Sequence, residues 1–264
     1  MQEYIQETVQ YNNLRSISIV IPAYNEENRI RPVLEEICEY IKLNKMPWNI
    51  IVSIDGDDDT EAIVKTMRAN NNFLDYIRGN GRGGKGSAIK KAVKLSSGEF
   101  TLLMDADGSI SLREIVGVIH YLDFYDGIIF DRYSNKNNLI PLYRKIPSRG
   151  FNILVRGILG IKVRDTQCGY KLIESRRLRT VFKKISFSNA FFDVAMLYYL
   201  KKSGANMKEI SVEYEHSNES KFNIFGLILG QGISLLGFRI RNSPLWNYIP
   251  NSLVKLYYRK FRWM

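Results

Sequence analysis

Phe100-Thr-Leu-Leu-Met-Asp-Ala-Asp107 decides the fold of this chain, because it is an apolar run that leads directly into two carboxylates one residue apart. Such a run, between Gly98 and Gly108, is typical of a strand buried in a parallel sheet. Ligands of open α/β sheets bind beyond the carboxyl ends of the strands, where we expect Asp105 and Asp107. Residues i and i+2 of an extended chain share a face, so both carboxylates can approach one Mg²⁺ or Mn²⁺ ion that holds a substrate diphosphate. A solvated acidic turn is the alternative, since Asp-x-Asp by itself is common.

Strand and helix patterns alternate through the first half of the chain, which is typical of a doubly wound α/β domain. Besides the strand above, we expect strands over 16–21 (ended by Pro22), 49–54, 73–77 and 126–130. The helices expected in this half are 31–43, 60–69, 85–95 and 111–122. After Arg132 we expect helices over 151–159 and 190–201, a loop and strand over 165–173, and a strand near 210–214.

The composition is that of a globular protein, with 45% hydrophobic and 25% charged residues over 264 positions. The net charge of +11 favours an anionic partner: nucleic acid, a phosphorylated substrate or an anionic membrane surface. Cys38 and Cys168 have no metal-ligand spacing and fit a reducing, cytosolic setting. We expect neither a signal peptide nor a membrane anchor in residues 1–13, and no stretch has the uncharged apolar length of a clear spanning helix.

Two more strands are followed by residues suited to a nucleotide. Pro22-Ala-Tyr-Asn-Glu-Glu27 can present an aromatic face, Tyr24, and a carboxylate, Glu26, to a base and ribose. A plain loop with acids near a helix N-terminus fits equally well. Asp55, which opens Asp55-Gly-Asp-Asp-Asp59, can accept hydrogen bonds from ribose hydroxyls, although the run can also form a turn that caps the next helix.

The run Asn80-Gly-Arg-Gly-Gly-Lys-Gly86 combines small residues and two cations with the start of a helix. It lacks the spacing of a Walker A loop, because Gly86 separates Lys85 from Ser87. We therefore interpret it as a basic loop that closes over a diphosphate, and a solvated loop is the alternative.

Taken in order, these motifs resemble the GT-A nucleotide-sugar domain of family 2 glycosyltransferases: Ile-Pro-Ala-Tyr-Asn-Glu-Glu, the Asp-Gly turn, Gly-Lys-Gly before a helix, and Met-Asp-Ala-Asp. The second half is similar to dolichyl-phosphate β-glucosyltransferases, relatives of the dolichyl-phosphate mannose synthases. The matching segments are Arg164-Asp-Thr-Gln-Cys-Gly-Tyr-Lys-Leu172, Phe192-Asp-Val-Ala-Met-Leu197 and Ser220-Lys221, and the whole resemblance covers residues 16–241.

The resemblance implies a Rossmann-like GT-A fold with a mostly parallel central sheet flanked by helices. It implies an inverting transfer of glucose from UDP-glucose to dolichyl or polyprenyl phosphate, which makes a lipid-linked sugar donor for protein glycosylation. Transfer of mannose from GDP-mannose is the alternative. It further implies an Mg²⁺ or Mn²⁺ cofactor and a peripheral position on the cytoplasmic face of a membrane.

By position in the matching motifs, the resemblance implies a donor site. The base and ribose would be lined by Pro22, Tyr24, Glu26 and Asp55. The ribose and diphosphate would lie along Asp105, Ala106 and Asp107, with Asp107 the principal metal ligand and Asp105 and Ser109 its companions. Lys85 and Lys221 would offset the charge on the leaving diphosphate. The family usually has two acids where this chain has Ile54-Asp55, so one base or ribose contact would be missing or shifted.

The resemblance also implies an acceptor site in which Arg132 and Arg144 grip the lipid phosphate, and in which Asp165 and Gln167 shape the sugar pocket. A phosphate monoester has a second pKa of about 6, so this nucleophile is largely dianionic at neutral pH and hardly needs a general base. Positioning then carries most of the catalysis. Asp193 is either a base or a structural acid paired with a neighbouring Arg or Lys.

We expect three parts: an N-terminal extension over 1–15, the GT-A domain over 16–220, and a membrane-interface segment over 221–264. In the last part, four apolar residues can share one face of a helix: Phe222, Phe225, Leu229 and Leu236. Aromatic residues and cations are interleaved beyond it, which favours an anionic membrane surface. Packing of this helix on its own domain is the alternative.

Two other classes of protein compete with the glycosyltransferase interpretation. A nucleic-acid-binding protein would account for the positive charge and the basic, aromatic tail, but not for acids at three strand ends, so we expect no nucleic acid partner. The other class is a domain that keeps the fold without the activity. Replacing Asp107 with Ala separates the two outcomes, because only an enzyme would lose metal-dependent transfer.

Overall fold

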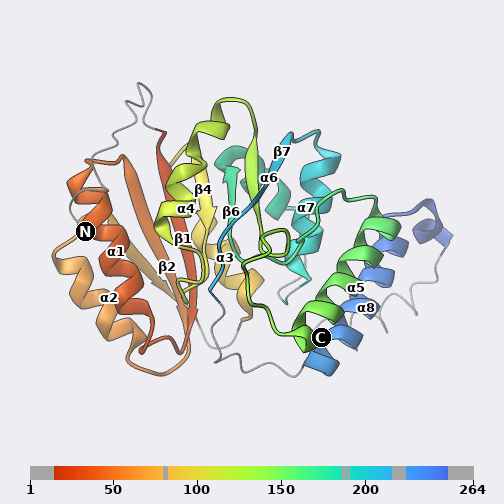
Figure 1. Ribbon diagram of the computed structural model, residues 1–264, viewed down its shortest axis with the longest axis horizontal. Coiled ribbons are helices and arrows are strands. Elements are labelled where there is room, and N and C mark those ends of the chain that lie inside the picture. Colours follow the sequence, from red (N-terminus) through yellow and green to blue (C-terminus); the bar gives the residue numbers. More distant parts are fainter. Residues whose placement is uncertain (1–14, 80–82, 186–188, 190, 216–223, 249–264) are drawn as a thin grey trace.

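The computed structural model describes residues 15–79, 83–185, 189, 191–215 and 224–248. Within these residues seven strands form one sheet (Figure 1): β1 (Ile17–Tyr24), β2 (Trp48–Asp55), β3 (Leu74–Arg78), β4 (Phe100–Leu103), β5 (Gly127–Asp131), β6 (Lys171–Glu174) and β7 (Met207–Ser211). Their order across the sheet is β3-β2-β1-β4-β6-β5-β7. β6 runs antiparallel to both of its neighbours, and the other pairs are parallel. The predicted mostly parallel sheet is confirmed.

Helices cover both faces of the sheet (Figure 1). One face is covered by α1 (Ile30–Leu43), α2 (Thr60–Ala69), α4 (Leu112–Gly117) and the short 3₁₀ helix η1 (Ile119–Asp123). The other face is covered by α3 (Lys85–Val93), α5 (Leu142–Leu159), α6 (Ser175–Phe182) and α7 (Phe192–Lys202). Helix α8 (Ile224–Arg241) packs against α5 and is followed by the 3₁₀ helix η2 (Pro244–Tyr248).

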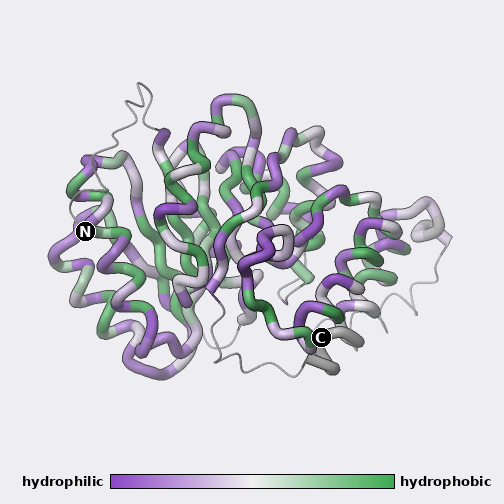
Figure 2. The backbone as a smooth tube through the Cα atoms, viewed as in Figure 1, coloured by the Kyte–Doolittle hydropathy of each residue, from purple (hydrophilic) through white to green (hydrophobic). Residues whose placement is uncertain are grey.

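Alternation along β1 explains the two hydrophobic layers. Ile19 and Ile21 pack in the layer under α1 and α4, whereas Val20 packs in the layer under α3 and α5. A strand covered on both faces needs apolar residues at nearly every position, and β1 has them. Figure 2 shows apolar residues gathered on the strands, and alternating with polar residues along α1 and α2.

The prediction that Pro22 ends the first strand is wrong. β1 continues through Pro22 to Tyr24 and stays paired with β2. The carbonyl of Val20 faces β4, where it accepts a hydrogen bond from the N–H of Met104. By alternation the nitrogen of Pro22 faces the same side, where β4 has already ended at Leu103. The missing N–H therefore costs no ladder hydrogen bond.

Several helix and strand limits also differ from the predicted ones. Helix α5 begins at residue 142, not 151, and contains Pro147, whose missing N–H would have bonded only to the first turn of the helix. Helix α6 is not predicted, and the helix predicted over 111–122 is divided into α4 and η1. β7 lies three residues before its predicted position, because Met207 is in register with the start of β5.

The amphipathic helix predicted in residues 221–264 overlaps α8, whose buried side packs on the protein itself. Leu235 and Phe238 are buried in the layer shared with α5 and α7, whereas Leu236 is 58% exposed. The side chains of the other three residues predicted for the apolar face lie outside the described part of the chain. Among the described residues, no helix has the length and apolar character needed to cross a bilayer.

Candidate active site

Three neighbouring strands, β1, β2 and β4, end at the same edge of the sheet. Tyr24, the last residue of β1, is in register with Asp55, the last residue of β2. On the other side of β1, Val20 is in register with Leu103, and its carbonyl accepts a hydrogen bond from the N–H of Met104 (3.0 Å). The acids that follow the three strands therefore meet at one edge, the usual ligand side of an open α/β sheet.

Side chains tie the loop after β1 to the loop after β2. Asn25 has a left-handed backbone (φ 54°), and its Oδ1 accepts a hydrogen bond from the N–H of Asp57 (3.1 Å). This approach requires Gly56, where a Cβ would lie 2.0 Å from that oxygen. Asp58 Oδ2 in turn accepts a hydrogen bond from the N–H of Glu27 (3.0 Å). The residues of the first loop thus have a fixed position relative to the second.

Asp55 is well suited to a nucleoside. It is 6% exposed, and within the described residues its Oδ1 has no hydrogen-bond partner. Gly79 makes room for this oxygen, because a Cβ there would lie 1.7 Å from it. A buried carboxylate oxygen without a donor is costly, and the hydroxyl and N–H groups of a nucleoside would supply one. Pro22 is half-buried and Tyr24 is 42% exposed at the same strand ends.

Asp105 is held by Lys85, the first residue of α3. The Nζ of Lys85 lies 2.5 Å from Asp105 Oδ1. Burial opposes the charge on both groups, but their mutual attraction raises the pKa of Lys85 and lowers the pKa of Asp105. Gly169 leaves space for the other carboxylate oxygen, since a Cβ there would lie 1.7 Å from Asp105 Oδ2. Both groups therefore stay charged and fixed.

Asp107 and Glu26 belong to the same acidic cluster. Burial raises the pKa of Glu26, its ion pair with Arg29 (2.7 Å) opposes that rise, and the charges of Asp107 and Asp105 add to it. Burial, with the same two carboxylates, raises the pKa of Tyr170 well above its ordinary value. The acids of the first and fourth strand ends are therefore close enough to interact.

The donor atoms at this edge fit a divalent ion that a diphosphate would complete. Asp107 Oδ1 accepts a hydrogen bond from the N–H of Ser109 (3.1 Å). In the part of the chain that the structure describes, no group of three or more His, Cys, Asp or Glu could hold an ion alone. Mg²⁺ is usually bound by one or two carboxylates together with substrate phosphates, and Asp105 and Asp107 match that mode. The metal roles of Asp105, Asp107 and Ser109, and the ribose contact of Ala106, stay predictions.

Arg132 follows β5 and is locked by Asp165, a carboxylate with no exposed surface. Nε and Nη2 of Arg132 donate to the two oxygens of Asp165 at 2.7 and 3.0 Å. The guanidinium also lies 5.5 Å from the ring centre of Tyr133 and 5.4 Å from that of Tyr214. Burial opposes its charge, but Asp165 raises the pKa of Arg132 well above its ordinary value. Asp165, assigned to a sugar pocket by resemblance, thus has Arg132 as its partner.

Arg144 lies in the first turn of α5, and its buried Nε has no partner within the described residues. Tyr133 connects the loop of Arg132 to this helix, because its hydroxyl hydrogen-bonds to Ser148 Oγ (2.6 Å). Gln167 is half-buried in the loop between α5 and β6. The contacts of Arg132, Arg144 and Gln167 with substrate stay predictions.

Asp193 forms a buried ion pair with Lys171. The Nζ of Lys171 lies 2.6 Å from Asp193 Oδ1 and also donates to the carbonyl of Cys168. This is the structural alternative that the sequence left open, and a role for Asp193 as a base stays a prediction. Sequence reasoning missed Lys171, which is the first residue of β6, a strand of only four residues that ends in a second charged residue, Glu174. The sequence therefore gives no clear signal of the buried pair. Lys221 lies outside the described residues.

The fold is shared with solved glycosyltransferases. Glucosyl-3-phosphoglycerate synthase from Mycobacterium tuberculosis, solved in complex with Mn²⁺, UDP and glucosyl-3-phosphoglycerate, has a TM-score of 0.63 to this chain. The two are 17% identical, and the match covers 85% of this chain and 80% of the synthase. At this identity the likeness shows the fold alone, which is the predicted GT-A fold.

The chain belongs to glycosyl transferase family 2, whose family model matches residues 18–182. A dolichyl-phosphate β-glucosyltransferase of Dictyostelium discoideum is 27% identical over 245 residues, which is 85% of this chain and 74% of the relative. Another, of Trichomonas vaginalis, is 31% identical over 232 residues, 80% of this chain and 69% of the relative. The resemblance read from the order of the motifs is confirmed, and the chain is a glycosyltransferase.

Proposed function

We propose that this glycosyltransferase moves glucose from UDP-glucose to the phosphate of dolichol or another polyprenol, with inversion at the anomeric carbon. Its product would be a lipid-linked sugar donor for protein glycosylation. The relatives named above are dolichyl-phosphate β-glucosyltransferases, and the solved synthase was crystallised with UDP and Mn²⁺.

One observation carries the proposal: an acidic donor side and a cationic acceptor side lie within electrostatic range of each other. Burial opposes the charge on Asp105, but nearby cations lower its pKa. Lys85 contributes most to that lowering, and Arg132 is the next residue. Arg132 comes from the end of β5, on the far side of β6 from β4, so two distant parts of the chain converge here. A sugar bound between them would have its leaving diphosphate at the acids and its incoming phosphate at the arginine.

The chain's own residues supply binding, alignment and charge. Asp55, with Pro22, Tyr24 and Glu26, would bind the nucleoside, and Asp107 with Asp105 would hold a divalent ion. That ion, when bound, neutralises charge on the diphosphate. Lys85, fixed on Asp105, adds a second positive charge beside the leaving group.

On the acceptor side, two of the five hydrogen-bond donors of Arg132 are spent on Asp165 and another is shared with the hydroxyl of Tyr214, which leaves donors for a phosphate. A guanidinium held in this way needs little further ordering when the acceptor binds. Arg144, with its unpartnered Nε, would be the second cation. Because the acceptor phosphate is already largely ionised, no base is required at the nucleophile.

We also propose that the protein works on the cytoplasmic face of a membrane as a peripheral protein. Apolar side chains are exposed along α5 and α8: Leu142, Tyr143, Ile146, Ile153, Leu154, Ile233, Leu236 and Ile240. Exposed apolar residues clustered on adjoining helices mark a membrane or protein contact. The net charge of +11 favours the anionic lipids of a cytoplasmic leaflet.

The test is a donor panel. The protein would be incubated in detergent with polyprenyl phosphate, Mg²⁺ or Mn²⁺, and radiolabelled UDP-glucose, UDP-galactose or GDP-mannose in turn. We expect label in the lipid phase from UDP-glucose alone, in β linkage, and none after chelation or with polyprenol that lacks the phosphate. Transfer from GDP-mannose alone would replace the proposed donor, and absence of any lipid product would overturn the proposal.

A further inference from the structure

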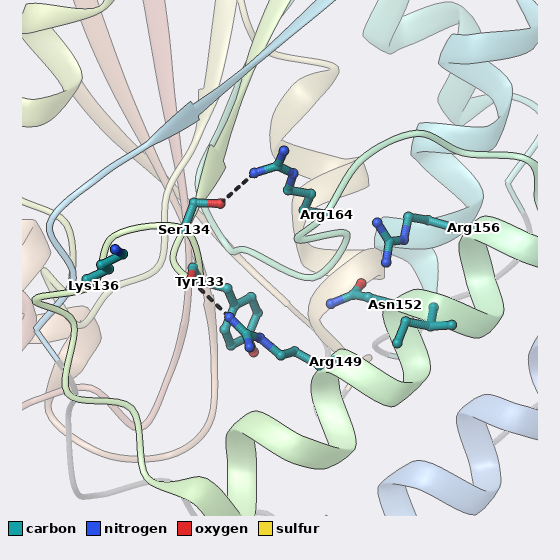
Figure 3. Close-up of a pocket in the computed structure, with 8 residues that line it drawn as sticks. Tyr133, Ser134, Lys136, Arg149, Asn152, Arg156 and Arg164 are labelled. Carbon is teal, nitrogen blue, oxygen red and sulfur yellow. Dashed lines mark hydrogen bonds between the residues drawn. The ribbon is translucent and has the colours of Figure 1, made fainter.

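A cavity of about 540 Å³ lies between α5 and the loops that follow β5 and α5 (Figure 3). Four cations line it, together with an amide and an apolar side chain: Lys136, Arg149, Arg156, Arg164, Asn152 and Ile153. None of them belongs to the donor or acceptor residues proposed above.

The lining of the cavity carries four positive charges and no negative one. No carboxylate lines it, and within the described residues none of its four cations lies within ion-pair distance of an acid. The side-chain hydrogen bonds that two of them make go to uncharged oxygens: Arg149 to the carbonyl of Tyr133 (3.2 Å), and Arg164 to Ser134 Oγ (3.1 Å). The backbone N–H of Arg164 donates to the carboxylate of Glu209 (2.6 Å), which is one negative charge beside four positive ones. Like charges held around one space repel each other, so an anion in that space would be stabilised.

Asn152 adds a buried donor that points to the same ligand. The residue is 2% exposed, and its Oδ1 accepts hydrogen bonds from the N–H and the hydroxyl of Thr166 (3.1 and 2.5 Å). A backbone N–H can only donate, so this bond fixes which end of the amide is which. The remaining Nδ2 has no partner within the described part of the chain, and Figure 3 shows it directed into the space between the arginines.

Tyr133 lines this cavity and also contacts the proposed acceptor site. Its ring centre lies 5.5 Å from the guanidinium of Arg132 and 5.9 Å from that of Arg149. Arg132 uses its fork on Asp165, so it does not turn into the cavity. A guanidinium from each of the two positive sites therefore lies close to one aromatic ring.

The surroundings of the cavity indicate an amphiphile. Ile153, which is 58% exposed, lines the cavity and continues along α5 into the exposed side chains of Leu142 and Ile146. We propose that the cavity binds the phosphate headgroup of an anionic membrane phospholipid, distinct from the acceptor, with its acyl chains along this apolar strip. The inference rests on the membrane association proposed above and not on the identity of the sugar.

The test uses Asn152→Asp, which keeps an oxygen for Thr166 but turns a carboxylate toward the four cations. Asn137→Asp, an exposed position on the loop after β5, makes the same charge change outside the cavity. Binding is measured by co-sedimentation with vesicles of phosphatidylcholine alone and with a minor share of phosphatidylglycerol. We expect Asn152→Asp to lose at least about tenfold in affinity for the anionic vesicles, and Asn137→Asp no more than the roughly fivefold that one surface charge contributes.

Equal losses in the two variants would overturn the proposal, because a diffuse basic surface predicts them. So would saturation of the cavity by millimolar inorganic phosphate with no preference for anionic vesicles, which would mark a soluble phosphate as the ligand. A raised KM for polyprenyl phosphate in detergent, with unchanged vesicle binding, would assign the cavity to the acceptor.

Arg156→Gln, at an exposed position, repeats the test if Asn152→Asp does not fold. Transfer to polyprenyl phosphate in detergent without phospholipid is assayed separately, so failure of the enzymatic proposal is distinguishable from failure of this one.

Discussion

Asp105 and Asp107 are two residues apart and have different surroundings. Asp105 has one oxygen on Lys85 and the other in the space that Gly169 leaves, so its position is determined by its neighbours. Asp107 accepts a hydrogen bond from the backbone N–H of Ser109 in the same turn. Asp105 is therefore suited to hold Lys85 and the local geometry, and Asp107 to bind a metal ion that arrives with the substrate.

Asp107→Asn is expected to abolish most metal-dependent transfer with little change in folding. The amide keeps an oxygen for the N–H of Ser109 but removes the negative charge, so we expect a loss of at least about 10²-fold in kcat/KM. The free energy of unfolding should change by less than about 1 kcal/mol. Asp75→Asn, on the exposed side of β3, is the matched control. Metal-dependent transfer at the wild-type rate in Asp107→Asn would contradict the assignment.

Arg132 and Asp165 are expected to behave as one unit. Asp165→Asn and Arg132→Gln should each lower the free energy of unfolding by about 3 kcal/mol, because each leaves a largely buried charge without its partner. The double variant should lose clearly less than the sum. Asp165→Asn should also raise the KM for the lipid acceptor, because it acts through the position of Arg132.

The measurement for this pair is urea unfolding of the four proteins, with acceptor kinetics on the folded ones. The matched control is Glu99→Gln, which breaks the exposed pair with Arg15 at the same 2.7 Å and should cost less than about 1 kcal/mol. If the losses in unfolding free energy of the two single variants add up in the double variant, Arg132 and Asp165 do not act as one unit.

At the scale of elements, the binding edge is built by loops that no single strand determines. The loop after β1 is held by the loop after β2, through Asn25 on one side and Asp58 on the other. Asp58 also accepts hydrogen bonds from the N–H and hydroxyl of Thr60, the first residue of α2 (3.2 and 2.7 Å). One carboxylate thus accepts a hydrogen bond from one of the free N–H groups at the start of α2 and fixes a neighbouring loop.

Asp58→Asn should reduce stability in a pH-dependent way. Burial opposes ionisation, but the hydrogen bonds from Thr60 and from the N–H of Glu27 lower the pKa of Asp58 below its unfolded value. A carboxylate whose pKa is lower in the folded than in the unfolded protein stabilises the fold at pH values above its unfolded pKa. That stabilisation is lost as the pH falls through the folded pKa. We therefore expect a loss of about 1 kcal/mol at neutral pH that shrinks below about pH 4. Thermal unfolding as a function of pH measures it.

The neighbouring Asp57→Asn is the control for this experiment, because that side chain is fully exposed. It should leave the stability nearly unchanged at all pH values. A difference between Asp58→Asn and wild type that grows as the pH falls would have the wrong sign and would exclude this role for Asp58.

At the scale of the whole molecule, the two ends of the sheet have different surfaces. The end formed by β3 and α2 is polar, whereas α5 and α8 at the other end expose apolar residues beside cations (Figures 1 and 2). The acceptor arginines lie toward this second end, because β5 and α5 supply them. A membrane contact there would bring a lipid phosphate to the arginines without removing it from the bilayer.

Ile146→Asp should weaken vesicle binding by about tenfold or more, because a buried isoleucine contributes about 1.5–3 kcal/mol when it leaves water. Stability should change little, since Ile146 is 66% exposed in the free protein. Leu43→Asp, at the C-terminal end of α1 and equally exposed at 66%, is the matched control. Vesicle co-sedimentation of the two variants decides the matter, and equal affinities would exclude α5 from the contact.

Much of the fold could be predicted from local patterns. The strands of the first half were found because apolar runs between turn residues depend on near neighbours. Pro22 was misjudged because the harm done by a missing N–H depends on whether a strand lies opposite, and β4 has ended there. The predicted helix 151–159 is shorter than α5 because the first turns of α5 are basic and exposed and contain a proline. They therefore lack the apolar periodicity of a buried helix.

The sequence by itself determined the class of fold, the family, and the acids that follow three strands, because motif order and short-range periodicity do not depend on the packing of distant segments. Tertiary structure decided the partners of the charged residues: Asp165 for Arg132, 33 positions away, and Asp193 for Lys171, 22 positions away. It also decided the cationic cavity beside α5. Such contacts depend on strand order and helix docking. These bring together residues whose pairing no local sequence pattern indicates.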